Sequence, residues 1–171
     1  MFYPGGMGIQ FVKQYAQAGL KEKIPLYSAF TSDETTLPAQ QEAALGDYEV
    51  GSWSPNLDIP ESHAFADAFK KKYNYLPSYY GQQSFDAILL IDSAVRAVGG
   101  DLAKKQEMIA AMEKADFKSA RGHFTYNVNH IPIENFYLLK IEKDAEGGYY
   151  RKVEGVVFPD HKDAYYEECK R

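Results

Sequence analysis

Three observations in the amino-acid sequence predict an α/β fold. Residues 1–30 read as a strand end, a glycine loop, a helix and a second strand, which together make half of a βαβ unit. Residues 60–114 carry three consecutive helical patterns of apolar side chains. After residue 122 the apolar spacing changes to that of β-strands, with glycine and asparagine turns between them.

The first thirty residues place a glycine loop before a helix. Phe2 and Tyr3 are predicted to end a strand, and Pro4–Gly6 to form a tight turn that no branched residue would tolerate. Apolar residues at helical spacing from Ile9 onward predict a helix that Gly19 ends. A buried strand is then expected over residues 24–30.

Ligands of open parallel sheets bind at the carboxyl ends of the strands, so the loops at 4–7 and 30–32 are expected to line one edge of a crevice. Backbone N–H groups of a glycine loop at a helix N-terminus can hold a carboxylate. A turn in which the glycines serve packing alone is the alternative.

The rest of the chain continues this alternation. The run 52–58 combines turn formers with Pro55 and predicts a crossing between two lobes. The helix over 82–98 is apolar around most of its circumference and is therefore predicted to be largely buried. The strand over 135–141 is apolar on both faces, which predicts a central position. Further helices are expected over 37–45, from Pro60 and after Asp101, and further strands over 47–52, 122–126 and 149–158.

Composition restricts the possible functions. With 19 basic and 24 acidic residues the net charge is −5, and no basic stripe is present, which argues against nucleic-acid binding. No apolar run is long enough to span a membrane, and the first residues do not read as a signal peptide. The single Cys169 is interpreted as an inert tail thiol or as the partner of a cysteine outside this chain.

The sequence lacks the motifs of common catalytic and cofactor sites. There is no Gly-x-Ser-x-Gly elbow, and the loop at 4–8 lacks the lysine of a P-loop and the third glycine of a dinucleotide fingerprint. The four histidines have neither a His-x-x-x-His pair nor a carboxylate at ligand spacing. We therefore expect no metal, no cofactor and no enzymatic activity.

The order of several segments is similar to that of a known family. FVKQYAQAGLK, IPLYSAF, ALGDYEVGSWSP, AFADAFKKKYNYLPSYYGQQSFDAILLIDSAV and ARGHFTYNVNHIP follow one another at sensible spacing. Together they resemble the C-terminal half of a type I periplasmic substrate-binding protein of the leucine/isoleucine/valine-binding class. No single motif is diagnostic, but the succession covers nearly the whole chain.

This resemblance implies part of a two-lobed fold whose three-layer αβα lobes contain parallel sheets, are joined by three crossings and close on a ligand by hinge motion. Residues 1–53 are then expected in the second lobe, 54–131 in the mainly helical part of the first lobe, and 132–171 back in the second lobe and its tail. Trp53, Ser54 and Pro55 are expected to form the hinge, with Trp53 either packed there or stacked on the ligand.

The resemblance also implies ligand contacts in the second lobe. The loop that contacts ligands in amino-acid binders falls on Gly5, Gly6 and Met7. The acidic residue that grips an α-ammonium in those proteins falls on Phe30 by ungapped matching. A shift in alignment would bring Asp33 or Glu34 to that place instead.

Further contacts are implied around Phe30 and in the first lobe. The aromatic residue before the buried first-lobe helix falls on Tyr80, with Tyr79 and Gln83 beside it. These side chains either contact a ligand or pack in the core. Thr31 either hydrogen-bonds a ligand oxygen or caps the segment that follows it.

The expected function is the solute-binding component of an ABC importer, periplasmic or extracellular, which contacts a membrane only through its permease subunits. Phe30 favours an aromatic or apolar carboxylate over an α-amino acid as ligand. A ligand-sensing domain of the same fold is the alternative, followed by a transferase that holds phosphate in the glycine loop. Because half a sheet would leave open edges, a second polypeptide or self-association is expected to complete the fold.

Overall fold

The computed structural model describes residues 1–123 and 125–169 of the chain. The strands are β1 (Tyr27–Ser28), β2 (Tyr48–Gly51), β3 (Thr125–Tyr126), β4 (Pro132–Lys143) and β5 (Tyr149–His161). The helices are α1 (Gly5–Gln17), α2 (Leu37–Gln40), α3 (Pro60–Tyr73), α4 (Tyr79–Ala97) and α5 (Lys105–Lys114), with 3₁₀ turns at Gln41–Ala44 and Tyr166–Glu168.

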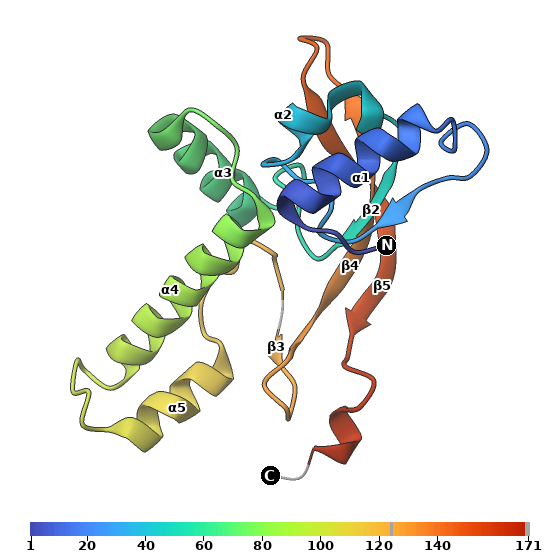
Figure 1. Ribbon diagram of the computed structural model, residues 1–171. Helices are drawn as coiled ribbons and strands as arrows, with labels where there is room; N and C mark the ends of the chain where they lie inside the picture. Colours follow the sequence, from blue (N-terminus) through green and yellow to red (C-terminus); the bar gives the residue numbers. More distant parts are fainter. Residues whose placement is uncertain (124, 170–171) are drawn as a thin grey trace.

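The chain has a sheet part and a helical part (Figure 1). The sheet part holds α1, α2 and the strands, and the helical part consists of α3, α4 and α5, which extend away from the sheet. The strand order is β1-β2-β4-β3, and β5 also pairs with β4. The β1–β2 pair is parallel, whereas the β2–β4, β3–β4 and β4–β5 pairs are antiparallel. The predicted α/β class and the central position of β4 are confirmed.

Several predicted element boundaries shift. The first helix begins at Gly5 rather than Ile9, so the predicted glycine loop forms its first turn, and Gly5 has a positive φ of 63° that glycine adopts readily. The predicted strand over 24–30 shortens to β1, and Ile24 is 56% exposed. Residue 1 runs beside β1 instead, since the Ala29 N–H donates to the carbonyl of Met1 (3.0 Å).

Other elements differ in length. The helix expected over 37–45 splits into α2 and a 3₁₀ turn. The strands expected over 135–141 and 149–158 extend to the full β4–β5 hairpin, which is longer because the two strands pair almost throughout. Of the strand expected over 122–126, β3 is observed, while Phe124 lies outside the described residues.

The prediction that the helix over 82–98 is largely buried is wrong for this chain. Ile88 is 65% exposed and Ile91 is 45% exposed. The buried residues of α4 are Tyr79, Gln82, Asp86 and Ala94. Among the described residues, α4 packs mainly against α5, so its opposite apolar face meets solvent.

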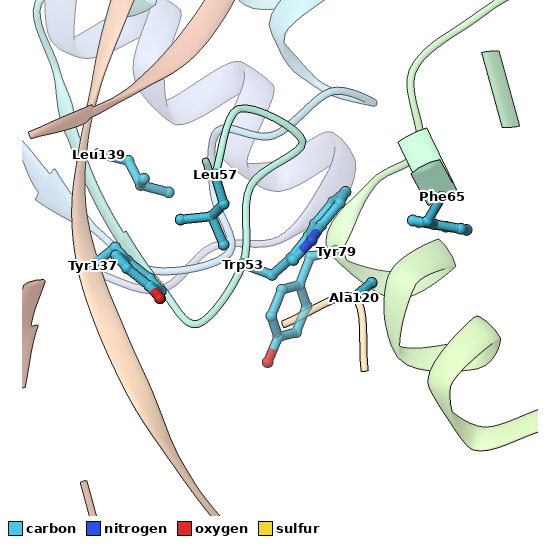
Figure 2. Close-up of a cluster of buried hydrophobic side chains, with 7 residues drawn as sticks. All are labelled: Trp53, Leu57, Phe65, Tyr79, Ala120, Tyr137 and Leu139. Atoms are coloured by element: carbon cyan, nitrogen blue, oxygen red, sulfur yellow. The ribbon is translucent and has the colours of Figure 1, made fainter. Parts of the chain in front are cut away.

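A hydrophobic cluster joins the two parts (Figure 2). Trp53 is fully buried at its centre, and its indole N–H donates to the Ser62 hydroxyl of α3 (2.9 Å). Tyr137 and Leu139 contribute from β4. The other buried members are Leu57, Phe65, Tyr79 and Ala120. The cluster therefore packs the start of the helical part against the middle of the sheet.

A buried charge network ties α4 to the start of β4. The Arg121 guanidinium donates to Asp86 of α4 (3.1 Å) and to Glu134 of β4 (2.7 Å), and all three side chains are at most 10% exposed. Asp86 also accepts hydrogen bonds from the Ser119 hydroxyl and the Ala120 N–H. One carboxylate thus anchors the segment that returns from the helices to the sheet.

We predict that Arg121→Met lowers the free energy of unfolding by about 3–5 kcal/mol, because it leaves two buried carboxylates without their cation. Arg96→Met is the matched control. Arg96 pairs with Asp92 on the surface of α4, with the two side chains 78% and 51% exposed, and its loss should cost about 0.5 kcal/mol or less. Urea unfolding of both variants measures the difference, and equal losses would contradict the structural role of Arg121.

A second buried acid makes stability depend on pH. Asp47, which precedes β2, is 3% exposed, and its Oδ2 has no hydrogen-bond partner among the described residues. Burial raises the pKa of Asp47 to about 7, with a smaller contribution from Glu49 and an opposing one from Lys21. Because this pKa is higher in the folded state, ionisation favours the unfolded chain, and stability falls as pH rises toward and through 7.

We predict that Asp47→Asn removes about 2 kcal/mol of the stability that the wild type loses between pH 5 and pH 8. Urea unfolding at both pH values measures the loss in each protein. An equally large loss in the variant would show that Asp47 titrates normally in the folded state.

Candidate functional site

Aromatic side chains from both parts of the chain meet where the parts join. Phe30, just after β1, lies 4.8 Å from Tyr79 and 6.3 Å from Tyr80 between ring centroids. Phe2 lies 5.9 Å from Phe30 with its ring edge-on. Tyr79 is buried, Phe30 is half-buried, and Phe2 and Tyr80 are exposed. These four residues are called the aromatic cluster below, and they form an apolar surface open to solvent at its rim.

The helix α4 positions the tyrosines of this cluster. Ser78 caps the helix by accepting a hydrogen bond from the Gly81 N–H (3.4 Å), so Tyr79 and Tyr80 fall in the first turn. Ser52, at the end of β2, donates to the Tyr79 hydroxyl (3.1 Å). Burial raises the pKa of Tyr79, which keeps the phenol neutral. Gln83 lies one turn along α4, with its side chain exposed.

The N-terminus of α1 lies against the segment that carries Phe30. A Cβ on Gly8 would lie 2.0 Å from the carbonyl oxygen of Tyr3 and 3.1 Å from the methyl group of Thr31, so only glycine fits there. Gly5, Gly6 and Met7 are exposed in the first turn, and no side chain of the described residues caps it. Their N–H groups can therefore receive an anion beside the aromatic cluster.

Thr31 is fully buried beneath Phe30. Its hydroxyl accepts from the Tyr3 N–H (3.1 Å) and donates to the Ala29 carbonyl (3.2 Å). Both partners precede Thr31 in the chain, so among the described residues its hydroxyl does not form the expected cap of the segment that follows. A ligand oxygen could bind this hydroxyl only by replacing one of these bonds.

The acidic residues that follow Phe30 are engaged within the protein. Asp33 is buried and accepts from the N–H groups of Thr35 (2.9 Å) and Thr36 (3.1 Å). Glu34 receives two hydrogen bonds from Arg151, at 2.9 and 2.7 Å, and both side chains are less than 10% exposed. Both oxygens of Glu34 are therefore occupied by Arg151, and Asp33 is buried with its Oδ1 bonded to the turn that follows it.

Glu49 is a further buried carboxylate, which the sequence analysis did not single out. It is 1% exposed on β2 and accepts from the Thr31 N–H (3.0 Å), the Ser32 N–H (3.4 Å) and the Ser28 hydroxyl (2.5 Å). Burial raises the pKa of Glu49, while the Ser28 hydrogen bond and the charge of Arg151 oppose the rise. The sequence could have pointed to it, because Glu49 is an acidic residue within the strand predicted over 47–52 and alternates there with less buried neighbours.

The crossing from β2 to α3 is closely packed. Trp53, Ser54 and Pro55 are buried, and the Asn56 side chain donates to the carbonyl of Arg151 on β5 (3.1 Å). Trp53 is packed inside the protein and bonded to α3, which is the packing interpretation given above. The assignment of residues 53–55 to a hinge stays a prediction.

In the part of the chain that the structure describes, no three His, Cys, Asp or Glu side chains group as a metal site would require. Within residues 1–123 and 125–169, no helix combines the length and apolar character needed to cross a membrane. Cys169 is exposed and free.

The sequence matches the periplasmic binding protein family over residues 1–147. It is 31% identical, over 159 residues, to the Leu/Ile/Val-binding protein homolog 6 of Brucella melitensis biotype 1, a match covering 88% of this chain and 40% of that relative. The chain therefore spans less than half the length of this relative.

Solved structures give the same relationship. An ABC-transporter solute-binding protein from R. palustris in complex with benzoate is 36% identical with a TM-score of 0.84, over 95% of this chain and 43% of that one. A solute-binding protein from Rhodopseudomonas palustris BisB5 in complex with 3,4-dihydroxybenzoic acid is 29% identical with a TM-score of 0.83, over 96% and 46% of the two chains.

These matches confirm the resemblance and the type I binding-protein fold that it implied, although the sheet described in this chain is mixed, with β1–β2 parallel and the pairs of β4 antiparallel. The structural relatives are two-lobed type I binding proteins of ABC transporters, and this chain corresponds to part of them. This chain therefore belongs to the periplasmic binding protein family.

Proposed function

We propose that this chain forms part of the solute-binding protein of an ABC importer, which binds a small aromatic carboxylate between its lobes and delivers it to permease subunits. The observation that carries the proposal is Phe30, which lies in an aromatic cluster while the acids that follow it are bonded internally. The complexes of two similar proteins with benzoate and 3,4-dihydroxybenzoic acid support the same ligand class.

The chemistry of the site favours an aromatic acid over an α-amino acid. An ammonium group buried beside Phe30 without a partner would cost several kcal/mol. An aromatic ring would instead pack on Phe30 and Tyr79, where aromatic pairs contribute about 0.5–1.5 kcal/mol beyond the area they bury. The N–H groups of Gly5, Gly6 and Met7 would bind the ligand carboxylate at the positive end of α1.

The remaining assignments follow from this proposal. Tyr80 and Gln83 complete the ligand site, with Thr31 supporting it from inside the protein, and the crossing at residues 53–55 acts as the hinge. Residues 1–53 and 132–171 belong to one lobe and residues 54–131 to the other. The protein works in the periplasm or outside the cell and meets the membrane through the permease.

We predict that the protein at its full natural length binds benzoate and not leucine in calorimetric titrations. Phe30→Ala should weaken benzoate binding by about 10- to 100-fold, because the ligand loses one apolar face of its site. Tyr27→Ala is the matched control, since Tyr27 stacks on Tyr48 (4.9 Å) outside the aromatic cluster and its loss should leave the affinity unchanged. Binding of leucine without binding of benzoate would overturn the proposal.

A further inference from the structure

We propose that Glu49 is a positioning residue for the ligand site: its buried carboxylate fixes the backbone at Phe30 and so holds the Phe30 ring in the aromatic cluster. The inference deepens the proposed function and rests on it. Glu49 itself is 1% exposed, so it acts through Phe30 rather than by touching the ligand.

The backbone of Phe30 has an unusual conformation. Its φ is +55°, in the left-handed region that a bulky residue without special support rarely occupies. Such a conformation persists only where the surroundings fix it, and it is commonly found at functional sites. The neighbouring hydrogen bonds therefore show what holds Phe30 in place.

Glu49 supplies the bonds directly after Phe30. Its Oε1 accepts from the N–H of Thr31 (3.0 Å), which is the N–H of the peptide bond that follows Phe30. Its Oε2 accepts from the next N–H, that of Ser32 (3.4 Å), and from the Ser28 hydroxyl on the other side of Phe30 (2.5 Å). One carboxylate thus binds the chain on both sides of Phe30.

The support extends beyond Glu49. The carbonyl of Thr31 accepts from the Gln40 side-chain amide (2.9 Å) and from the Thr36 hydroxyl (3.1 Å). Both the N–H and the carbonyl of Thr31 are therefore hydrogen-bonded. The charge of Arg151 favours ionised Glu49, as the effect of Arg151 on the pKa of Glu49 shows. Burial works against that ionised form, so the turn is held by the number of hydrogen bonds on one carboxyl group together with the nearby charge of Arg151.

The position of the ring follows from that turn. With φ at +55°, the Phe30 ring lies 4.8 Å from the Tyr79 ring. A return of φ to the usual negative range would redirect the side chain and remove this contact. Glu49 thus affects ligand choice in two ways. It holds the Phe30 ring at the site, and its carboxyl oxygens accept hydrogen bonds from backbone N–H groups, so they are not available to a ligand ammonium.

The test uses Glu49→Gln in the protein at its full natural length, with benzoate as the probe. The amide keeps the size of the side chain but loses the charge and one of two acceptor oxygens. We expect faster hydrogen exchange of the Thr31 and Ser32 amides in NMR spectra and benzoate binding about tenfold weaker. In a Phe30→Ala background the same change should no longer affect affinity, because no ring remains to be placed.

The control is Asp47→Asn, which also neutralises a buried acid next to β2. Among the described residues, Asp47 makes no hydrogen bond to Thr31 or Ser32. This variant should leave the benzoate affinity unchanged. If Glu49→Gln does not fold, Ser28→Ala removes one donor to the same carboxylate and should weaken binding in the same direction, again only when Phe30 is present.

The outcomes separate this inference from the proposed function. A wild type that does not bind benzoate refutes the proposed ligand class. A wild type that binds, together with Glu49→Gln or Ser28→Ala variants that bind equally well, overturns the role of Glu49. The same loss of affinity with and without Phe30 overturns it too, because Glu49 would then act on the whole structure rather than on the ring.

Discussion

Two buried arginines hold the sheet part and the crossing segments in place. Arg121 connects Asp86 of α4 with Glu134 of β4. Arg151 binds Glu34 through its guanidinium, while its carbonyl accepts a hydrogen bond from the crossing before α3. A buried charge without a partner is costly, so each pair fixes the segments that carry it. The hydrophobic cluster around Trp53 adds apolar contacts between the crossing, the helical part and β4.

This arrangement explains why the candidate site lies at the junction. Phe30 belongs to the sheet part and Tyr79 to the helical part, and the two rings meet at 4.8 Å. The Ser52 hydroxyl, at the start of the crossing, bonds to Tyr79 and links the site directly to the segment between the parts. Any rotation of one part relative to the other would therefore change the geometry of the aromatic cluster.

Local sequence patterns were enough for much of the fold. The helix from Pro60 and the central strand β4 follow from spacing within a few residues, and both are observed. The exposure of Ile88 was missed because burial of a helix face depends on what packs against it, which periodicity does not record. Likewise Gly8 and Glu49 matter through contacts with residues 31 and 32, and only the folded chain brings these together.

The selectivity proposed for the site depends on the hydrogen bonds that the acidic residues near Phe30 make within the protein. Asp33, Glu34 and Glu49 all lie within reach of the segment around Phe30, and each is bonded to N–H groups or to Arg151. To pair its ammonium group with Glu34 or Glu49, an α-amino acid would have to displace one of these bonds, whereas an aromatic acid needs no such exchange. Selectivity between two ligands is the difference between their binding free energies. Weaker binding of the α-amino acid therefore contributes to selectivity just as stronger binding of the aromatic acid does. Internal hydrogen bonding of these acids and the apolar ring of Phe30 therefore act in the same direction.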